Sequence, residues 1–239
     1  MRDIKKTSFS FKRFFGGALF LIIFYFWVTL PSVTPLMHQE PSETRFMKVR
    51  IEKLSENGKE IVLARTWVPL SKISNHLQRA VIAAEDARFF EHRGFDWESL
   101  KSAFQKNWKK GSFVRGGSTI TQQLAKNLYL TPQKSLWRKA REFIIAWKME
   151  RILNKERILE LYLNYAEWGP GVFGAEAASR YYFKKPASKL TATDAAFLAV
   201  ILPNPIKYGK KPLAAKLQRR MNRILRDMNE ISLKVTSKE

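Results

Sequence analysis

The chain has 239 residues, 45% of them hydrophobic, which is enough for one well-packed domain with an extension. It contains no cysteine, so disulfide bonds and thiolate metal sites are excluded. Its 43 lysines and arginines outnumber 21 aspartates and glutamates, and the net charge of +22 indicates an anionic partner such as nucleic acid, acidic lipid head groups or a phosphorylated substrate.

The N-terminal segment has the pattern of a membrane anchor. No charged residue occurs between Phe14 and Met37, and a helix over residues 14–33 is long enough to cross the roughly 30 Å hydrocarbon core of a bilayer. Residues 1–13 hold five basic side chains and one acidic one, which predicts a cytoplasmic tail. A cleaved signal peptide is the alternative, but no small-x-small cleavage site follows the apolar run.

We therefore expect a single-pass protein of the cytoplasmic (inner) membrane, with its N-terminus inside and its main domain on the periplasmic or outer face. Outside the cytoplasm, phospholipid head groups and membrane-carried phosphates are better candidate partners than nucleic acid.

The exported part is expected to be mainly α-helical. Two partly alternating runs, residues 45–54 and 61–70, flank the turn-forming pair Asn57-Gly58 and predict a β-hairpin close to the membrane. Residues 34–59 are therefore assigned to a juxtamembrane linker and hairpin. In the following domain, residues 60–239, Ser74 and Asp96 are placed to cap helices. The predicted helices cover about 74–87, 96–111, 118–130, 133–153, 155–165, 171–182, 191–202 and 212–230.

Two adjacent carboxylates, Glu85 and Asp86, interrupt an apolar run near the end of the first of these helices. Glu85 follows Val81 by four residues, so it is expected to be half buried at the edge of the apolar face. Burial and the helix dipole both raise the pKa of a carboxyl there, which suits a general base. A solvated acid at a helix end is the alternative. Nearby, His92 and Gly94 are expected to shape a turn, because the histidines have no metal-ligand spacing.

The segment 115–127, RGGSTITQQLAKN, has the features of an anion-binding helix start. Two glycines before Ser118 let the backbone approach a ligand closely, and the free N–H groups of a helix start attract anions. Ser118, Gln122 and Lys126 recur every four residues, which predicts a polar stripe suited to a sugar phosphate. An ordinary N-cap with a solvated face is the alternative, and the spacing of Gly and Lys excludes a P-loop.

A second carboxylate is expected inside the long helix at 133–153. Arg138 and Glu142 lie four residues apart, which by itself indicates only an intrahelical ion pair. The helix is apolar on two sides, however, so Glu142 is expected to be partly buried beside a guanidinium that keeps it ionised. Further along, Glu160 and Asn164 also lie four residues apart and are expected to support neighbouring segments.

In this order, the segments resemble the peptidoglycan glycosyltransferases of family 51, which include the polymerase domain of class A penicillin-binding proteins and its monofunctional relatives. The resemblance covers roughly residues 60–205, and no Ser-x-x-Lys motif of a transpeptidase occurs. The matching motifs are Glu85-Asp86 with Phe89, His92 and Gly94; Gly116 through Asn127; Arg138, Lys139 and Glu142; Lys155 through Asn164; and the Gly/Ala and Tyr-Phe region at 171–183 and 195–205.

The resemblance implies a lysozyme-like glycosyltransferase domain, partly embedded in the membrane surface, that polymerises lipid II. A lipid-linked glycan strand would be the donor and lipid II the acceptor, and undecaprenyl pyrophosphate would leave with inversion at the anomeric carbon. By analogy, Glu85 deprotonates the acceptor 4-hydroxyl, while Glu142 assists the departing pyrophosphate. The implied substrate-binding residues are Asp86, Gly117, Ser118, Thr119, Gln122, Gln123, Lys126, Asn127, Lys134 and Arg138. The implied supporting residues are Phe89, His92, Gly94, Glu160 and Asn164.

The loop between the second and third motifs departs from the family pattern at one position. Lys134 stands where some relatives carry an arginine, and a lysine lacks the bidentate fork of a guanidinium. Lytic cleavage of peptidoglycan and a non-enzymatic, membrane-tethered cell-wall scaffold are the alternative functions. A divalent cation, Mg²⁺ or Mn²⁺, is a candidate companion of the pyrophosphate, although no dedicated set of metal ligands is visible. Proteins of cell-wall synthesis or division are candidate partners.

Overall fold

The computed structural model describes residues 13, 14, 16, 17, 20, 21, 24, 25, 28–56, 63–110, 117–133, 135–210 and 212–233. The chain forms two compact units, Met1–Ser32 and Val33–Glu239. In the first unit, the described residues between 13 and 29 are helical. The predicted anchor at 14–33 falls partly outside the described residues, and among those that are described no helix combines the length and apolar character needed to cross a membrane.

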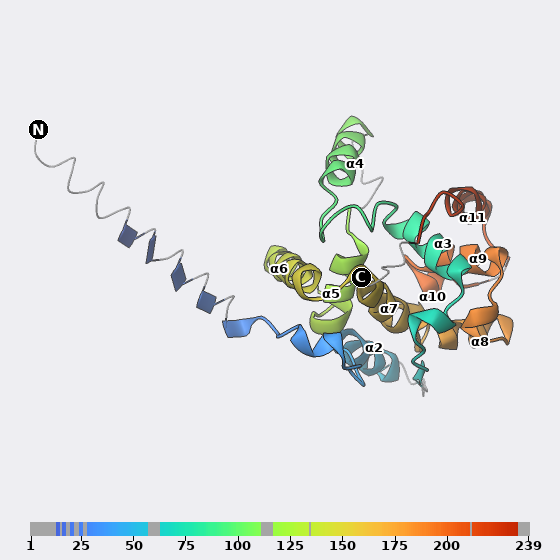
Figure 1. The fold of residues 1–239 in the computed structure, drawn as a ribbon, viewed down its shortest axis with the longest axis horizontal. Helices are drawn as coiled ribbons and strands as arrows, with labels where there is room; N and C mark the ends of the chain where they lie inside the picture. The colour runs from blue at the N-terminus through green and yellow to red at the C-terminus, as the bar shows by residue number, and fades with distance from the viewer. Residues whose placement is uncertain are drawn as a thin grey trace, which may run out of the picture. The chain divides into compact units, whose positions relative to one another are not determined.

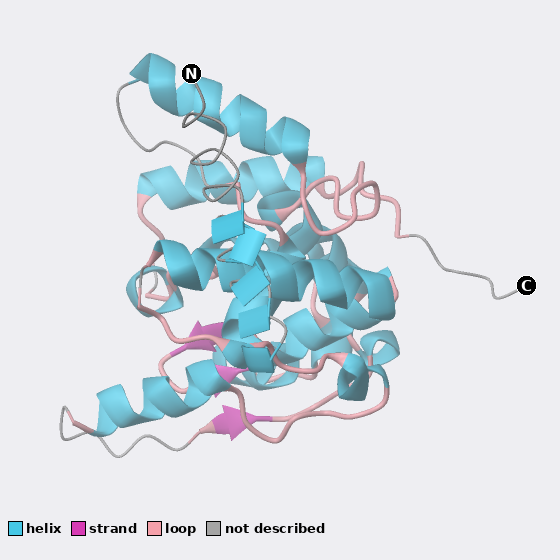
Figure 2. Cartoon of the chain, turned by 90° about the vertical axis from the view of Figure 1, so that its left-hand side faces the viewer, coloured by secondary structure: helices cyan, strands magenta, loops and turns pink. Residues whose placement is uncertain are grey.

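The second unit is mainly helical, as predicted (Figures 1 and 2). Its helices are α2 (Arg45–Ser55), α3 (Asn75–Glu85), α4 (Trp97–Lys110), α5 (Ile120–Tyr129), α6 (Leu136–Ile152), α7 (Lys155–Tyr165), α8 (Ala175–Phe183), α9 (Ala192–Ile201), α10 (Pro205–Tyr208) and α11 (Ala215–Asp227), with short 3-10 helices η1 (Thr34–Met37), η2 (Leu70–Lys72) and η3 (Ala187–Lys189). The helices predicted from residue 74 onward are confirmed, with boundaries that differ by a few residues.

Polar side chains fix the starts of these helices. The Ser74 hydroxyl accepts a hydrogen bond from the backbone N–H of His76, and Asp96 Oδ1 accepts one from the N–H of Ser99 at 2.8 Å. Each such bond satisfies an N–H group that has no partner within the helix itself. The capping predictions for α3 and α4 are therefore confirmed.

The helices pack as two groups. In Figure 1, α2, α5, α6 and α7 lie to the left of α3, α9 and α11. In one group α5 contacts α2, α6 and α7; in the other α3 packs against α9 and α11. α9 is apolar around its whole circumference and buried from Ala195 to Ile201, as expected for a helix surrounded by others. α4 projects away from the other helices (Figure 1). The end of α3 meets the start of α5, and the candidate site forms there.

The predicted hairpin between residues 45 and 70 is wrong, because residues 45–55 form α2. Met47 and Ile51 are four residues apart and suit a helix, whereas Met47, Val49 and Ile51 alternate as in a strand, so the short run is ambiguous. Packing against α5 and the complete burial of Met47 favour the helix. Asn57-Gly58 lies outside the described residues.

A small hairpin does occur, but later in the chain. β2 (Glu167–Gly169) pairs antiparallel with β3 (Val172–Phe173), and β1 (Ala64–Arg65) adds to β3 in parallel, giving the order β1-β3-β2 (Figure 2). Gly171 lies in the turn before β3, β3 takes residues 172–173, and Gly174 is the N-cap, which explains why α8 begins at Ala175 and not at 171 as predicted.

Candidate active site

Glu85 is the last residue of α3, and its side chain is only 11% exposed. Burial raises the pKa of Glu85 above the usual 4.5, while hydrogen bonds from Gln123 and Arg220 and the charge of Lys126 oppose that rise. The negative end of the α3 dipole also lies at this position. A carboxyl group with a raised pKa is suited to accepting a proton near neutral pH.

A chain of hydrogen bonds orients Glu85 from α5 and α7. Gln123 Nε2 donates to Glu85 Oε2 at 2.9 Å, and Tyr162 OH donates to Gln123 Oε1 at 2.9 Å. Burial raises the pKa of Tyr162 well above 10, so its hydroxyl stays protonated and fixes the amide orientation of Gln123. Gln123 therefore presents its NH₂ group to the carboxylate.

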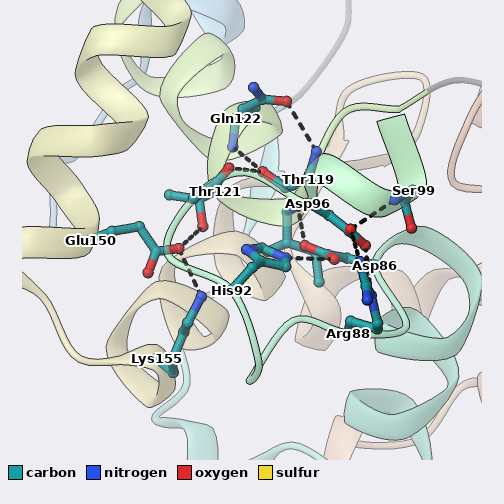
Figure 3. A network of polar contacts seen from close by, with 12 residues as sticks. Asp86, Arg88, His92, Asp96, Ser99, Thr119, Thr121, Gln122, Glu150 and Lys155 are labelled. Atoms are coloured by element: carbon teal, nitrogen blue, oxygen red, sulfur yellow. Dashed lines mark hydrogen bonds and ion pairs between the residues drawn. The ribbon is translucent and has the colours of Figure 1, made fainter. Parts of the chain in front are cut away.

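Asp86 is turned away from Glu85 and lies inside the protein. Its Oδ1 is 2.8 Å from His92 Nε2, and its Oδ2 accepts the backbone N–H of Ile120 at 3.0 Å (Figure 3). The Asp86 side chain is only 3% exposed. Both oxygens are thus used by protein donors, and the contacts favour a role in joining the end of α3 to the start of α5. Direct binding of substrate by Asp86 stays a prediction.

The start of α5 is held by a reciprocal cap. The Thr119 hydroxyl accepts from the N–H of Gln122, and Gln122 Oε1 accepts from the N–H of Thr119 (Figure 3). Thr119 Oγ1 also donates to the carbonyl of Gly94 at 2.7 Å. Gly94 has φ of +86°, which a residue with a Cβ rarely adopts, so this turn needs glycine. Gln122 is therefore buried within the cap, whereas Ser118 is exposed at the helix start.

Glu142 on α6 forms the centre of a cationic cluster. Arg138 Nη1 donates to Glu142 Oε2 at 2.6 Å, and Lys139 Nζ pairs with Oε1 of the same carboxylate. Lys139 Nζ also donates to Ser118 Oγ at 3.1 Å, which joins α6 to the segment before α5. The predicted burial of Glu142 beside a guanidinium is confirmed, because the residue is 3% exposed. Two cations share one carboxylate, so the cluster retains net positive charge.

Lys126 on α5 interacts electrostatically with both Glu85 and Glu142. Burial lowers the pKa of its ammonium, as do Arg138 and Lys139, whereas Glu142 and Glu85 raise it. Within the part of the chain that the structure describes, no hydrogen bond or ion pair reaches the Lys126 ammonium. A half-buried ammonium beside an excess of positive charge is suited to binding an anionic group of a ligand.

Asn164 and Glu160 on α7 hold the segment before α3. Asn164 Oδ1 accepts the N–H of Val68 at 3.0 Å, and its Nδ2 donates to the Val68 carbonyl at 2.9 Å. Glu160 Oε1 accepts the N–H of Leu70 at 3.3 Å, and its Oε2 pairs with Arg157. These contacts agree with the expectation that both residues support neighbouring segments.

Beneath the site lies a second polar network that the sequence did not indicate. Glu150 Oε1 accepts from Thr121 Oγ1 at 2.5 Å and from Lys155 Nζ at 2.9 Å (Figure 3). The Lys155 ammonium also lies 4.5 Å from the centroid of the buried Phe89 ring. The network fixes α5 against α6 and α7, and it places Phe89 inside the core.

Two further predicted residues lie close to these groups. Gly117 comes shortly before the Thr119 cap, and Asn127 follows Lys126 and is buried on α5. Lys134 lies outside the described residues, as do residues 115 and 116. Among the described residues, no group of three or more His, Cys, Asp or Glu is arranged to hold a metal ion.

Arg220 is the main site residue that the sequence did not reveal. Its Nη2 lies 3.4 Å from Glu85 Oε1, although the two residues are 135 positions apart. The apolar periodicity around Arg220 predicts a helix, but no local pattern shows which arginine of that helix faces Glu85.

Comparison with known proteins places these residues in a family. A family model described as transglycosylase matches residues 52–229. A biosynthetic peptidoglycan transglycosylase from Methylobacillus flagellatus is 48% identical over 204 residues, which cover 85% of this chain and 89% of that relative. The protein of the same name from Dechloromonas aromatica is 53% identical over 188 residues, covering 79% and 81%, and that from Chromobacterium violaceum is 47% identical over 212 residues, covering 89% and 92%. The chain therefore belongs to the transglycosylase family.

Proposed function

We propose that this transglycosylase polymerises peptidoglycan glycan strands from lipid II, with inversion at the donor anomeric carbon and release of undecaprenyl pyrophosphate. The observation that carries the proposal is the pairing of Glu85, a buried carboxyl with a raised pKa, with the Lys126 ammonium and the cationic cluster around Glu142. Glu85 can accept a proton, and Lys126 with the cationic cluster can bind phosphate. The relatives' names support the same substrate class.

In the proposed reaction, ionised Glu85 accepts the proton of the acceptor 4-hydroxyl as that oxygen attacks the donor anomeric carbon. The bond between that carbon and the pyrophosphate oxygen breaks, and the electron pair leaves with the phosphate. Lys126 and Arg138 stabilise the charge that develops on the leaving group. Glu142 holds Arg138 and Lys139 in place through its two oxygens. Gln123 keeps the Glu85 carboxylate oriented throughout.

We also propose that the domain works at a membrane surface, tethered by residues 14–33 with the N-terminus inside. Apolar side chains are exposed on α4 and α6, among them Trp97 at 63%, Leu136 at 92% and Trp147 at 45%. Phe143 contacts Trp97, with ring centroids 6.3 Å apart, so these exposed groups are linked between the two helices. Aromatic and aliphatic side chains concentrated on one surface favour the bilayer interface.

The membrane proposal is tested with brominated lipids, which quench tryptophans that enter the bilayer. We expect quenching in the full chain to fall in Trp97→Phe and Trp147→Phe variants, and Trp168→Phe serves as the control because Trp168 is fully buried. Equal quenching in all variants would contradict contact between this surface and the bilayer.

The polymerase proposal is tested with purified full-length chain and lipid II in detergent. We expect glycan strands to accumulate and isolated sacculi to stay intact. Solubilised sacculi without use of a lipid-linked donor would instead indicate lytic cleavage. The scaffold alternative predicts a different pair of results. Removal of surface charge would weaken binding to cell-wall polymers, whereas substitutions of Glu85 and Glu142 would leave that binding unchanged.

A further inference from the structure

α11 brings a cation to one oxygen of Glu85, while α5 contacts the other oxygen. The helix packs against α3 and α9 (Figure 1), and its buried face includes Met221 and Ile224, which are 8% and 3% exposed. Arg220 precedes Met221 at the edge of that face and is half-buried, with 35% of its side chain exposed. The packing of α11 therefore fixes where the Arg220 side chain begins, next to the end of α3.

The two oxygens of Glu85 have different donors on different helices. Arg220 Nη2 donates to Oε1 at 3.4 Å from α11, while Gln123 Nε2 donates to Oε2 at 2.9 Å from α5. A carboxylate held at both oxygens has one defined orientation, and a guanidinium remains charged at any pH at which the protein folds. The contact is long for a hydrogen bond, and 11% of the Glu85 side chain remains exposed.

We propose that Arg220 is a positioning residue for Glu85, holding Oε1 so that the carboxylate is directed at the acceptor hydroxyl. This inference rests on the proposed function, in which Glu85 is the base. Arg220 has a second consequence, because its charge opposes the effect of burial on the pKa of Glu85 and so enlarges the ionised fraction near neutral pH.

Other charged groups near Glu85 must be separated from this effect. The charge of Lys126 on α5 lowers the pKa of Glu85. Tyr162 on α7 is linked to Glu85 by way of Gln123, and Asp86 is the next residue in the chain. Among the described residues, the other basic side chains of α11 are exposed and make no hydrogen bond or ion pair with Glu85; they are Lys216, Arg219, Arg223 and Arg226. Arg223 therefore offers a matched control on the same helix.

The test measures kcat and KM for lipid II across pH with the full-length chain. In Arg220→Met, loss of one charge-assisted hydrogen bond is expected to lower kcat at pH 7 by about tenfold and to move the acidic limb of the profile to higher pH, with KM nearly unchanged. Arg220→Gln keeps a donor but not the charge and should show the same shift of the limb. Arg220→Lys should restore the position of the limb and only part of kcat, and Arg223→Met should match the wild type.

Two results would overturn the inference. One is an Arg220→Met profile that coincides with that of Arg223→Met. The other is a fall in kcat with no movement of the acidic limb, which indicates a purely structural role. If Arg220→Met does not fold, Arg220→Gln is judged by the same two criteria.

A measurement without turnover separates this inference from the proposed function. Titration of ¹³C-labelled glutamate carboxyls by NMR, with the Glu85 signal identified by its loss in Glu85→Gln, should show a higher Glu85 pKa in Arg220→Gln than in the wild type. An unchanged Glu85 pKa overturns the role of Arg220 whether or not the chain polymerises lipid II. A wild-type chain that makes no glycan overturns the proposed function alone.

Discussion

Replacing Asp86 with alanine should destabilise the domain strongly, because this buried carboxylate joins α3 to α5. The substitution removes the contact with His92 and leaves the N–H of Ile120 without its acceptor. An unsatisfied buried donor costs about 1–3 kcal/mol and the lost hydrogen bond about 1 kcal/mol. Loss of a negative charge at the start of α5 adds about 0.5 kcal/mol. Part of this is offset because a carboxylate no longer has to be desolvated, so we expect a net loss of about 3 kcal/mol.

Urea unfolding of the full-length chain in detergent at pH 7, followed by circular dichroism, measures this loss. Asp86→Asn is the matched control, since its amide oxygen can still accept from Ile120, and it should lose only about 1 kcal/mol. Asp86→Asn should also keep glycan polymerisation within about tenfold of the wild type, because both contacts of Asp86 are internal. A loss below about 1 kcal/mol in Asp86→Ala would refute the joining role. A stable but inactive Asp86→Asn would instead support direct binding of substrate.

Three further predictions concern other parts of the site. Asn164→Ala removes three hydrogen bonds, to both backbone groups of Val68 and to the carbonyl of Glu160, and should lower the free energy of unfolding by about 3 kcal/mol. A loss under about 1 kcal/mol in urea titrations would contradict the role of Asn164 in holding the segment before α3. Lys126→Met should lower kcat/KM for lipid II by at least about tenfold without destabilising the fold, since the ammonium makes no ion pair with the described residues, and a stability loss with normal kinetics would contradict it. Because burial raises the pKa of Glu85 above 4.5, the folded state binds a proton at Glu85 more tightly than the unfolded state does. Glu85→Gln should therefore increase the free energy of unfolding at pH 7, and this gain should shrink as the pH falls through the raised pKa towards 4.5. An equal gain at all pH values would contradict the raised pKa.

Local signals in the sequence were sufficient for the helices and for Glu85. Ser74 and Asp96 cap the helices that they were expected to cap, and the spacing from Val81 placed Glu85 correctly at the edge of a buried face. Capping and amphipathic periodicity involve residues within a few positions of one another, so a single sequence contains them. α2 was mispredicted because its short apolar run suits two periods, and only packing against α5 decides between them.

The site itself depends on contacts between distant segments. The stripe expected from Ser118, Gln122 and Lys126 is divided in the fold, because Gln122 closes the cap with Thr119 while Gln123 faces Glu85. Which of two adjacent glutamines points to a carboxylate is decided by where α3 ends. The same holds for Arg220, whose partner lies 135 residues earlier in the chain.

The central claim, that Glu85 is the general base of glycan polymerisation, is tested most directly by the initial rate of lipid II polymerisation at pH 7. The full-length wild-type chain is compared with Glu85→Gln and with Glu91→Gln, an exposed glutamate in the following loop. A positioned base contributes about 10²–10⁴ to a rate, so Glu85→Gln should lose at least about a hundredfold while Glu91→Gln retains the wild-type rate. A Glu85→Gln protein that is folded and polymerises lipid II at the wild-type rate would contradict the claim.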